Sequence, residues 1–175
     1  MRPGEKSESI TERDVAQALS DGQKADYFRR SYTAVDGLWF MKVGESHGFE
    51  EALNLDEQVW MVQPKIQSRM IRSMLQAGEG LEALFRCLAV RLSLEGFEFR
   101  AERGEDGIWV EVVRCPWHEL MVKAGREALN NQVGERICQA ENAVWASEFG
   151  PGIRFVREER ICDGKARCLL RFSRD

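Results

Sequence analysis

Side chains that can do chemistry gather in the last third of this sequence. Four of the five cysteines follow residue 114, and one of the two histidines lies three residues after the first of them, in Cys115-Pro-Trp-His118. Thiolate and imidazole groups are the usual ligands of zinc and of many iron sites. One interpretation of this pattern is therefore a zinc or iron site, and its five candidate ligands are Cys115, His118, Cys138, Cys162 and Cys168.

A second interpretation places most of these thiols in the hydrophobic core, since a free cysteine often behaves as a small apolar side chain. A single Cys-x-x-His is a weak metal signal, and the other spacings match no zinc ribbon or finger. Strand geometry also favours the core. A two-residue turn at Asp163-Gly164 would place Cys168 opposite Glu159 and turn Cys162 to the other face of the sheet, because side chains alternate along a strand.

Cys115 and His118 are also the candidates for a catalytic pair. Histidine titrates near neutral pH and can act as a general base that activates a thiol nucleophile. The simpler alternative is a histidine that hydrogen-bonds locally at the start of a helix. The sequence contains no glycine-rich phosphate loop, no nucleophile-elbow serine and no metalloprotease helix motif. These absences argue against the large enzyme superfamilies that carry such motifs.

Three residues of the N-terminal half are candidates for ligand binding: Asp36, Trp39 and Glu45. Asp36 lies beside an aromatic stripe, and a carboxylate in such surroundings can have a raised pKa. It can equally pair with Arg29 or Arg30 at the helix surface, which is the ordinary state of a charged side chain.

The composition limits the classes of partner. The formal net charge is −4 and no long basic block is present, so the sequence predicts no nucleic-acid-binding surface. No stretch approaches the ~18 consecutive apolar residues of a membrane span. The polar first residues are followed by no hydrophobic run, so no signal peptide is expected. We therefore expect a cytoplasmic protein whose five cysteines form no disulfide bonds.

Apolar periodicity predicts a helical half that ends near residue 96. The first helix begins near residue 24, and its apolar stripe is Phe28, Tyr32, Val35, Trp39 and Val43. Steps of three and four residues place this stripe on one helix face, so we expect Trp39 to be buried. We expect the same of Trp60, because aromatic residues are dense around it in the sequence.

Two more helices are expected in this half. The second opens at Asn54, and Pro64 should kink it because proline removes a backbone donor. Its apolar stripe comprises Leu55, Val59, Val62, Ile66, Met70 and Met74. The third helix covers residues 81–95 and stops at Gly96, and Cys87 lies on an apolar row that should enter the core.

After Gly96 the apolar period changes to two, which is typical of strands. Residues 97–103 and 108–114 predict one hairpin, and residues 153–161 and 167–172 predict a second. Two helices, over residues 117–130 and 133–149, are expected between them. The pattern predicts an α+β fold, in which the two hairpins form one antiparallel sheet with helices packed on one face.

The expected domain organisation is simple. Residues 1–22 are polar and predict a mobile leader. Residues 23–175 predict a single α+β domain, made of a helical half over 23–96 and a hairpin-helices-hairpin half over 97–175.

Two groups of motifs resemble known families. Ser31-Tyr-Thr-Ala-Val-Asp-Gly-Leu-Trp-Phe40, Asp56-Glu-Gln-Val-Trp60 and Cys115-Pro-Trp-His118 resemble an uncharacterised prokaryotic family of cytosolic proteins, over most of residues 24–172. Glu159-Arg-Ile-Cys162-Asp-Gly-Lys-Ala-Arg-Cys168 resembles the end of 4-vinyl reductase-like domains. That resemblance implies small-molecule binding, with zinc held by cysteines at such positions.

The order of helices, hairpin, helices and hairpin is also similar to the L-2-amino-thiazoline-4-carboxylic acid hydrolase family, which implies ring-opening hydrolysis. We therefore expect a domain that binds a small molecule or a metal ion between the helices and the C-terminal sheet. A first alternative is a hydrolase of small cyclic amides or thiazolines, acting through Cys115 and His118 or through metal-bound water. A second alternative is a protein-interaction or homodimerising module that uses the tryptophan-rich helical surface.

Overall fold

The computed structural model describes residue 11 and residues 18–174. Most of the predicted mobile leader therefore lies outside the described residues. The chain divides into two compact units, residues 1–37 and residues 38–175. Helix α2 (Asp21–His47) contains the boundary between them. The prediction that residues 23–175 form a single domain stays a prediction.

The helix expected from Asn54 onward is in fact two helices, α3 (Phe49–Trp60) and α4 (Gln63–Leu75). Pro64 lies in the first turn of α4. Proline is well accommodated there, because its missing N–H would have no partner in the helix anyway. The predicted kink at Pro64 is therefore wrong, since the proline starts a new helix. The start at Asn54 is also wrong, since Gly48 precedes the first residue of α3.

Helix α5 (Leu81–Glu95) confirms the third predicted helix. It ends at Gly96, whose φ of 84° lies in the left-handed region that glycine adopts without strain. The first hairpin is confirmed as well. Its strands are β1 (Glu98–Arg103) and β2 (Gly107–Arg114), and they pair in an antiparallel manner.

The chain after β2 contains α6 (Pro116–Lys123), a short 3-10 helix η1 (Glu127–Leu129) and α7 (Asn130–Glu148). Helix α6 is shorter than expected, because Gly125 at φ 68° follows its end and redirects the chain. The second hairpin consists of β3 (Ile153–Glu159) and β4 (Cys168–Arg174), with the 3-10 helix η2 (Ile161–Asp163) between them.

The predicted two-residue turn of this hairpin is wrong. Glu159 pairs with Leu169 and not with Cys168. The connection is longer because η2 occupies part of it. Cys162 is therefore not on a strand, and the alternation of side chains does not decide where it points.

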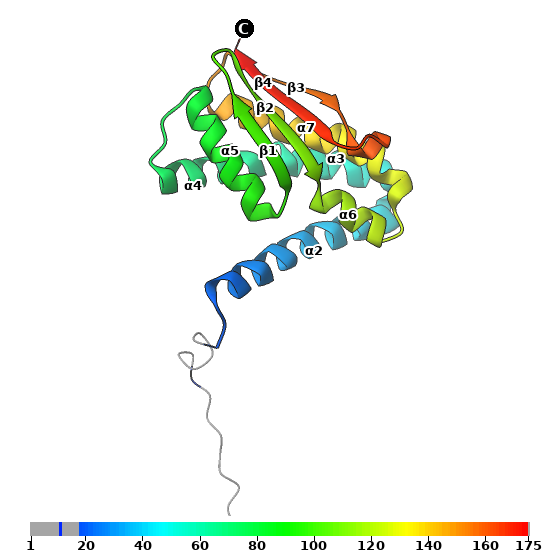
Figure 1. Ribbon diagram of the computed structural model, residues 1–175. Coiled ribbons are helices and arrows are strands. Elements are labelled where there is room, and N and C mark those ends of the chain that lie inside the picture. The colour runs from blue at the N-terminus through cyan, green and yellow to red at the C-terminus, as the bar shows by residue number, and fades with distance from the viewer. Residues whose placement is uncertain (1–10, 12–17, 175) are drawn as a thin grey trace, which may run out of the picture. The chain divides into compact units, whose positions relative to one another are not determined.

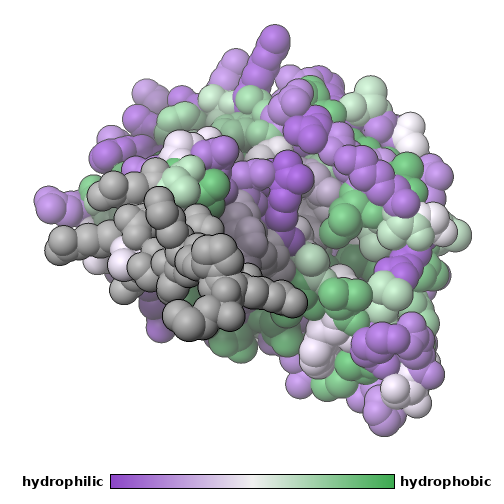
Figure 2. Space-filling view, turned by 90° about the horizontal axis from the view of Figure 1, so that it is seen from below, coloured by the Kyte–Doolittle hydropathy of each residue, from purple (hydrophilic) through white to green (hydrophobic). Residues whose placement is uncertain are grey.

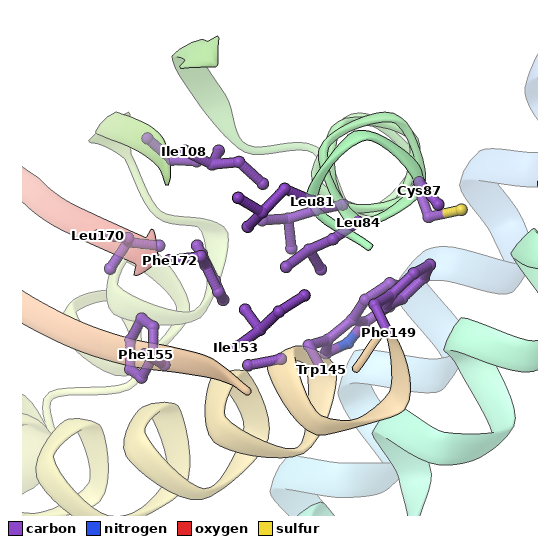
Figure 3. Close-up of a cluster of buried hydrophobic side chains, with 14 of the residues drawn as sticks. Leu81, Leu84, Cys87, Ile108, Trp145, Phe149, Ile153, Phe155, Leu170 and Phe172 are labelled. Atoms are coloured by element: carbon purple, nitrogen blue, oxygen red, sulfur yellow. The ribbon is translucent and has the colours of Figure 1, made fainter. Parts of the chain in front are cut away.

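All four strands form one antiparallel sheet in the order β1-β2-β4-β3, which confirms the predicted α+β fold (Figure 1). Helix α5 packs on β1 and β2, and α7 packs on β3. Hydrophobic side chains of these helices and of the inner sheet face form the core shown in Figure 3. Its fully buried members include Leu84, Cys87, Ile108, Trp145, Phe149 and Phe172. The prediction that Cys87 is a core residue is therefore confirmed.

The burial of the helical half differs from the expectation. Trp60 is 4% exposed, as predicted, but Trp39 is 44% exposed. The apolar row of α4 is exposed too, with Val62, Ile66, Met70 and Met74. Periodicity identifies the apolar face of a helix but not whether another element covers it. Figure 2 shows apolar and polar residues interspersed on the face seen from below.

Within the part of the chain that the structure describes, no helix has the length and apolar character needed to cross a bilayer.

Candidate functional site

Four of the predicted thiols lie in the second unit. Cys115 lies between β2 and α6, Cys138 lies in α7, Cys162 lies in η2, and Cys168 begins β4. Cys115 and Cys138 are each close enough to Cys168 for a negative charge on one thiol to raise the pKa of the other. A negative charge on Cys168 likewise raises the pKa of Cys162. We call these four residues the thiol region.

Close packing of η2 on α7 brings Cys162 into this region. A Cβ atom added at Gly134 of α7 would lie 2.9 Å from the sulfur of Cys162, so only glycine leaves room for the sulfur in this position. Cys168 is held from its own hairpin, because its sulfur accepts a hydrogen bond of 3.2 Å from the backbone N–H of Ile161. All four cysteine residues have intermediate exposure, so none of them is fully buried.

The surrounding protein keeps these thiols protonated. Removal from water raises the pKa of Cys115 to about 12, and the backbone N–H groups of His118 and Trp117 offset only a part of this effect. Burial also raises the pKa of Cys138, and the neighbouring Cys115 and Glu141 add to the shift. A nucleophilic cysteine needs a thiolate at neutral pH, so these surroundings disfavour thiolate catalysis.

His118 is engaged away from Cys115. Its Nδ1 is hydrogen-bonded to the side-chain amide of Asn130, a buried residue at the start of α7. Among the residues that the structure describes, no hydrogen bond joins the ring of His118 to the sulfur of Cys115. Catalysis by this pair stays a prediction, and the local hydrogen bond matches the simpler alternative for the histidine.

The predicted metal ligands do not form a preassembled metal centre. Within residues 18–174, no group of three or more histidine, cysteine, aspartate or glutamate side chains is arranged to hold a metal ion. In this arrangement the five candidates do not fit zinc or iron, and we derive no chemical step through a metal. Binding of zinc or iron stays a prediction from the sequence.

The sequence patterns did not single out Arg157, although it lies in the same region. It follows Ile153 and Phe155 at a spacing of two along β3, so all three side chains lie on the inner face of the sheet. Its Nη1 donates a hydrogen bond of 2.6 Å to the carbonyl oxygen of Gly134. Burial raises the pKa of Cys138 and of Cys168, and the charge of Arg157 offsets a part of this rise. The signal in the sequence was a charged residue at an apolar position of the strand.

A buried ion pair borders the thiol region on the helical side. Arg91 of α5 is 2% exposed and donates a hydrogen bond to Glu141 of α7, which is 7% exposed. Arg91 also donates two hydrogen bonds of 3.1 Å to Glu95. Glu141 in turn affects the pKa of Cys115 and of Cys138. Polar and charged groups therefore continue from the thiol region into the helical layer.

A separate groove of about 500 Å³ lies on the surface between α3 and α7. Its floor is formed by small and apolar side chains, among them Met61, Ala140 and Ala143. Glu57 and Arg136 at its edge pair with each other. These two charges therefore neutralise one another, and Glu135, Gln139 and Ser147 supply the other polar groups of the lining.

The three candidates of the N-terminal half lie on α2, away from the thiols in sequence. Asp36 belongs to the first unit, and Trp39 and Glu45 belong to the second. Glu45 accepts a hydrogen bond of 2.6 Å from Lys42 on the helix surface, which is the ordinary state of a surface carboxylate. Ligand binding by these three residues stays a prediction.

Comparison with known proteins identifies the family. The model of the L-2-amino-thiazoline-4-carboxylic acid hydrolase family matches residues 65–172, which is more than half of the 175-residue chain. The chain therefore belongs to this family. The matched segment contains the whole thiol region and Arg157, whereas Asp36, Trp39 and Glu45 precede it. The resemblances to the uncharacterised cytosolic family and to 4-vinyl reductase-like domains stay predictions.

No curated protein sequence matches the chain. Among solved structures, the phenol-responsive sensory domain of the transcription activator PoxR with phenol is similar, with a TM-score of 0.47 and 13% sequence identity. The similarity covers 81% of this chain and 73% of that chain. At this level it carries no argument about fold or function.

Proposed function

We propose that this protein binds a small organic molecule at the thiol region, against Cys115, Cys138 and Cys168. Membership of the family supports this function, because the name of the family describes an enzyme of a small ring-containing carboxylic acid. The segment that matches the family contains every residue of the thiol region.

One observation carries the proposal. Arg157 of β3 and Cys168 of β4 lie on the inner side of the sheet, where apolar side chains would otherwise continue the core, and the thiols of Cys115 and Cys138 are close enough to Cys168 to interact with it electrostatically. A small number of polar groups in apolar surroundings is the usual composition of a ligand site. Structural cysteines would not require Arg157 beside them, and a charge on this face costs free energy unless something compensates it.

Binding of L-2-amino-thiazoline-4-carboxylic acid to the purified full-length protein tests the proposal. Isothermal titration calorimetry should detect binding to the wild type and weaker binding to Cys138→Ala and Cys168→Ala. The matched control is Cys87→Ala, which removes a thiol from the core outside the thiol region. Absence of binding to the wild type at millimolar concentration, or equal losses in all three variants, would rule the proposal out.

Hydrolysis of the bound compound is the second candidate function, and the family name favours it. The raised pKa of Cys115 favours attack by a water molecule over attack by a cysteine. Water would add to the carbon between nitrogen and sulfur, and cleavage of the carbon–sulfur bond would open the ring and leave a thiol. Release of this thiol, followed with a thiol reagent, separates a hydrolase from a protein that only binds.

The same preparations test the remaining predictions. Zinc and iron per chain, measured in the wild type and in Cys115→Ser and Cys168→Ser, decide whether the thiols hold a metal. Size-exclusion chromatography with light scattering decides whether the protein is a homodimer.

A further inference from the structure

We infer that Arg157 is the anion-binding residue of this site, and that the ligand is a small organic carboxylate whose carboxylate group pairs with its guanidinium. The inference rests on the proposed function, because it assigns a residue and a chemical class to the ligand of the thiol region.

The position of Arg157 is unusual for a charged residue. It pairs across the sheet with Leu170, which is 6% exposed and part of the core. Residues directly opposite each other in an antiparallel pair share one face of the sheet. Arg157 therefore points toward the helices. A charge on such a face is costly unless a partner of opposite sign compensates it.

The hydrogen bonds of Arg157 offset only a part of the free energy that a charge on the inner face costs. Among the described residues, the one hydrogen-bond partner of Arg157 is the carbonyl oxygen of Gly134, which accepts from Nη1. Its Nε is buried and has no partner. Within the described part of the chain, no carboxylate lies at ion-pair distance from Arg157. Nε and Nη2 together form an edge of the guanidinium that makes no hydrogen bond to the described residues, and such an edge can bind both oxygens of a carboxylate at once.

The carboxylates nearest to the thiol region are already paired with other arginines. Glu141 is bound by Arg91. Asp163 is bound by Arg160, which also contacts Glu135. Among the described residues these carboxylates form no ion pair with Arg157, and an anion from outside the chain is the partner that we infer.

The backbone beside Arg157 departs from a regular strand. The register between β3 and β4 shifts between Arg157 and Glu159, as in a β-bulge. Bulges redirect side chains and are frequent next to functional sites. The residue as a whole is partly exposed, whereas its Nε is buried.

A comparison of two ligands and four proteins tests the inference. The ligands are L-2-amino-thiazoline-4-carboxylic acid and 2-amino-2-thiazoline, which lacks the carboxylate. The proteins are the wild type, Arg157→Gln, Arg157→Lys and the matched control Arg154→Gln. Arg154 lies on the same strand but is exposed on the outer face. Dissociation constants for all pairs come from isothermal titration calorimetry.

We expect the wild type and Arg154→Gln to bind the carboxylate roughly 10- to 100-fold more tightly than the compound without it, the usual range for a charge-assisted hydrogen bond. Arg157→Gln should lose this preference and bind both compounds weakly. Arg157→Lys should keep a part of this preference, since the positive charge remains but an ammonium group does not bind both carboxylate oxygens in the bidentate geometry of a guanidinium.

Two outcomes would overturn the inference in distinguishable ways. If Arg157→Gln keeps the preference while Cys138→Ala and Cys168→Ala lose binding, the assignment of Arg157 is wrong and the proposed function stands. If the wild type binds neither compound, the proposed function itself fails.

A purely structural role for Arg157 makes a different prediction without ligand. Removal of an uncompensated charge should leave the Tm of ligand-free Arg157→Gln equal to or above that of the wild type. A fall in Tm larger than that of Arg154→Gln would show that the bond to Gly134 serves the fold, and would overturn the inference.

Discussion

Arg91 of α5 and Glu141 of α7 form an ion pair in the interior, with 2% and 7% of their surfaces exposed. The guanidinium also bonds Glu95 one turn further along α5. The Cζ atom of Arg91 lies 5.7 Å from the centre of the Trp145 ring, a distance typical of a cation–π contact. The pair therefore connects the two helices that cover the sheet.

Loss of Arg91 should be strongly destabilising. Arg91→Met leaves the buried Glu141 without its guanidinium, and loss of one partner of a buried ion pair typically costs about 3–5 kcal/mol. The double variant Arg91→Met/Glu141→Leu removes both charges and should unfold at a higher urea concentration than Arg91→Met alone. Urea denaturation at pH 7, followed by circular dichroism, measures both effects.

The comparison of single and double variants isolates the electrostatic cause. If the double variant is as unstable as Arg91→Met, the lost stability comes from packing or from Glu95, which loses its guanidinium in both variants, and not from the carboxylate of Glu141. The matched surface pair is Lys42 and Glu45, both of which are exposed. Lys42→Met should cost no more than about 1 kcal/mol, since exposed ion pairs contribute little.

Two isoleucines of α4 offer a direct test of the arrangement of the helices. Ile71 is 4% exposed and Ile66 is 56% exposed. Ile71→Ala should destabilise by about 2–5 kcal/mol, the usual cost of emptying a core position. Ile66→Ala should change stability by less than about 1 kcal/mol. Urea denaturation of both variants measures the difference, and similar losses would mean that the α4 row is covered in solution.

The α4 row also shows what the sequence can and cannot predict. Apolar periodicity located the helices and strands well, because it follows directly from the backbone geometry of each element. It did not reveal which apolar face is covered. Ile66 and Trp39 lie on regular stripes yet are exposed, whereas Ile71 was not on the predicted stripe and is buried. Coverage depends on tertiary contacts between segments far apart in the chain.

The candidate site was predictable only in part, because the relative positions of its residues also depend on tertiary contacts. The late cysteines were recognised from their residue type alone. Their mutual positions were not, because the connection between β3 and β4 contains η2 and not a two-residue turn. The sequence patterns did not single out Arg157, because a single charge in a strand pattern does not reveal what lies opposite it. The spacing along β3 and the pairing with Leu170 show that it faces inward.

The protonated state of Cys115 predicts a loss of stability at alkaline pH. Its pKa is raised to about 12 in the folded protein, whereas an unfolded cysteine titrates near pH ~8.5. The folded state therefore holds its proton more tightly, and this contribution is complete below pH ~8.5 and is lost as the pH rises toward ~12. Each pH unit in this window should remove up to about 1.4 kcal/mol for one such thiol.

Urea denaturation between pH 8 and pH 10.5 measures this dependence. Cys115→Ala should show a shallower loss of stability with pH than the wild type, because the variant lacks the thiol. Other groups that titrate in this range are common to both proteins and cancel in the comparison. Parallel curves for the two proteins would show that Cys115 titrates normally in the folded state.

The close approach of Gly134 and Cys162 predicts that substitutions at these two positions are coupled. Alanine is about 1 kcal/mol more favourable than glycine inside a helix, but a Cβ atom at position 134 would meet the sulfur of Cys162 at 2.9 Å. Gly134→Ala should therefore stabilise the Cys162→Ala protein, in which that sulfur is absent. In the wild type the same substitution should be neutral or destabilising, since the Cys162 side chain must move away from its place in the thiol region.

A double-mutant cycle from urea denaturation gives the coupling free energy, which we expect to be about 1 kcal/mol, within the range for residues in contact. An equal effect of Gly134→Ala in both backgrounds would mean that η2 does not pack on α7 at this point, and that Cys162 lies outside the thiol region.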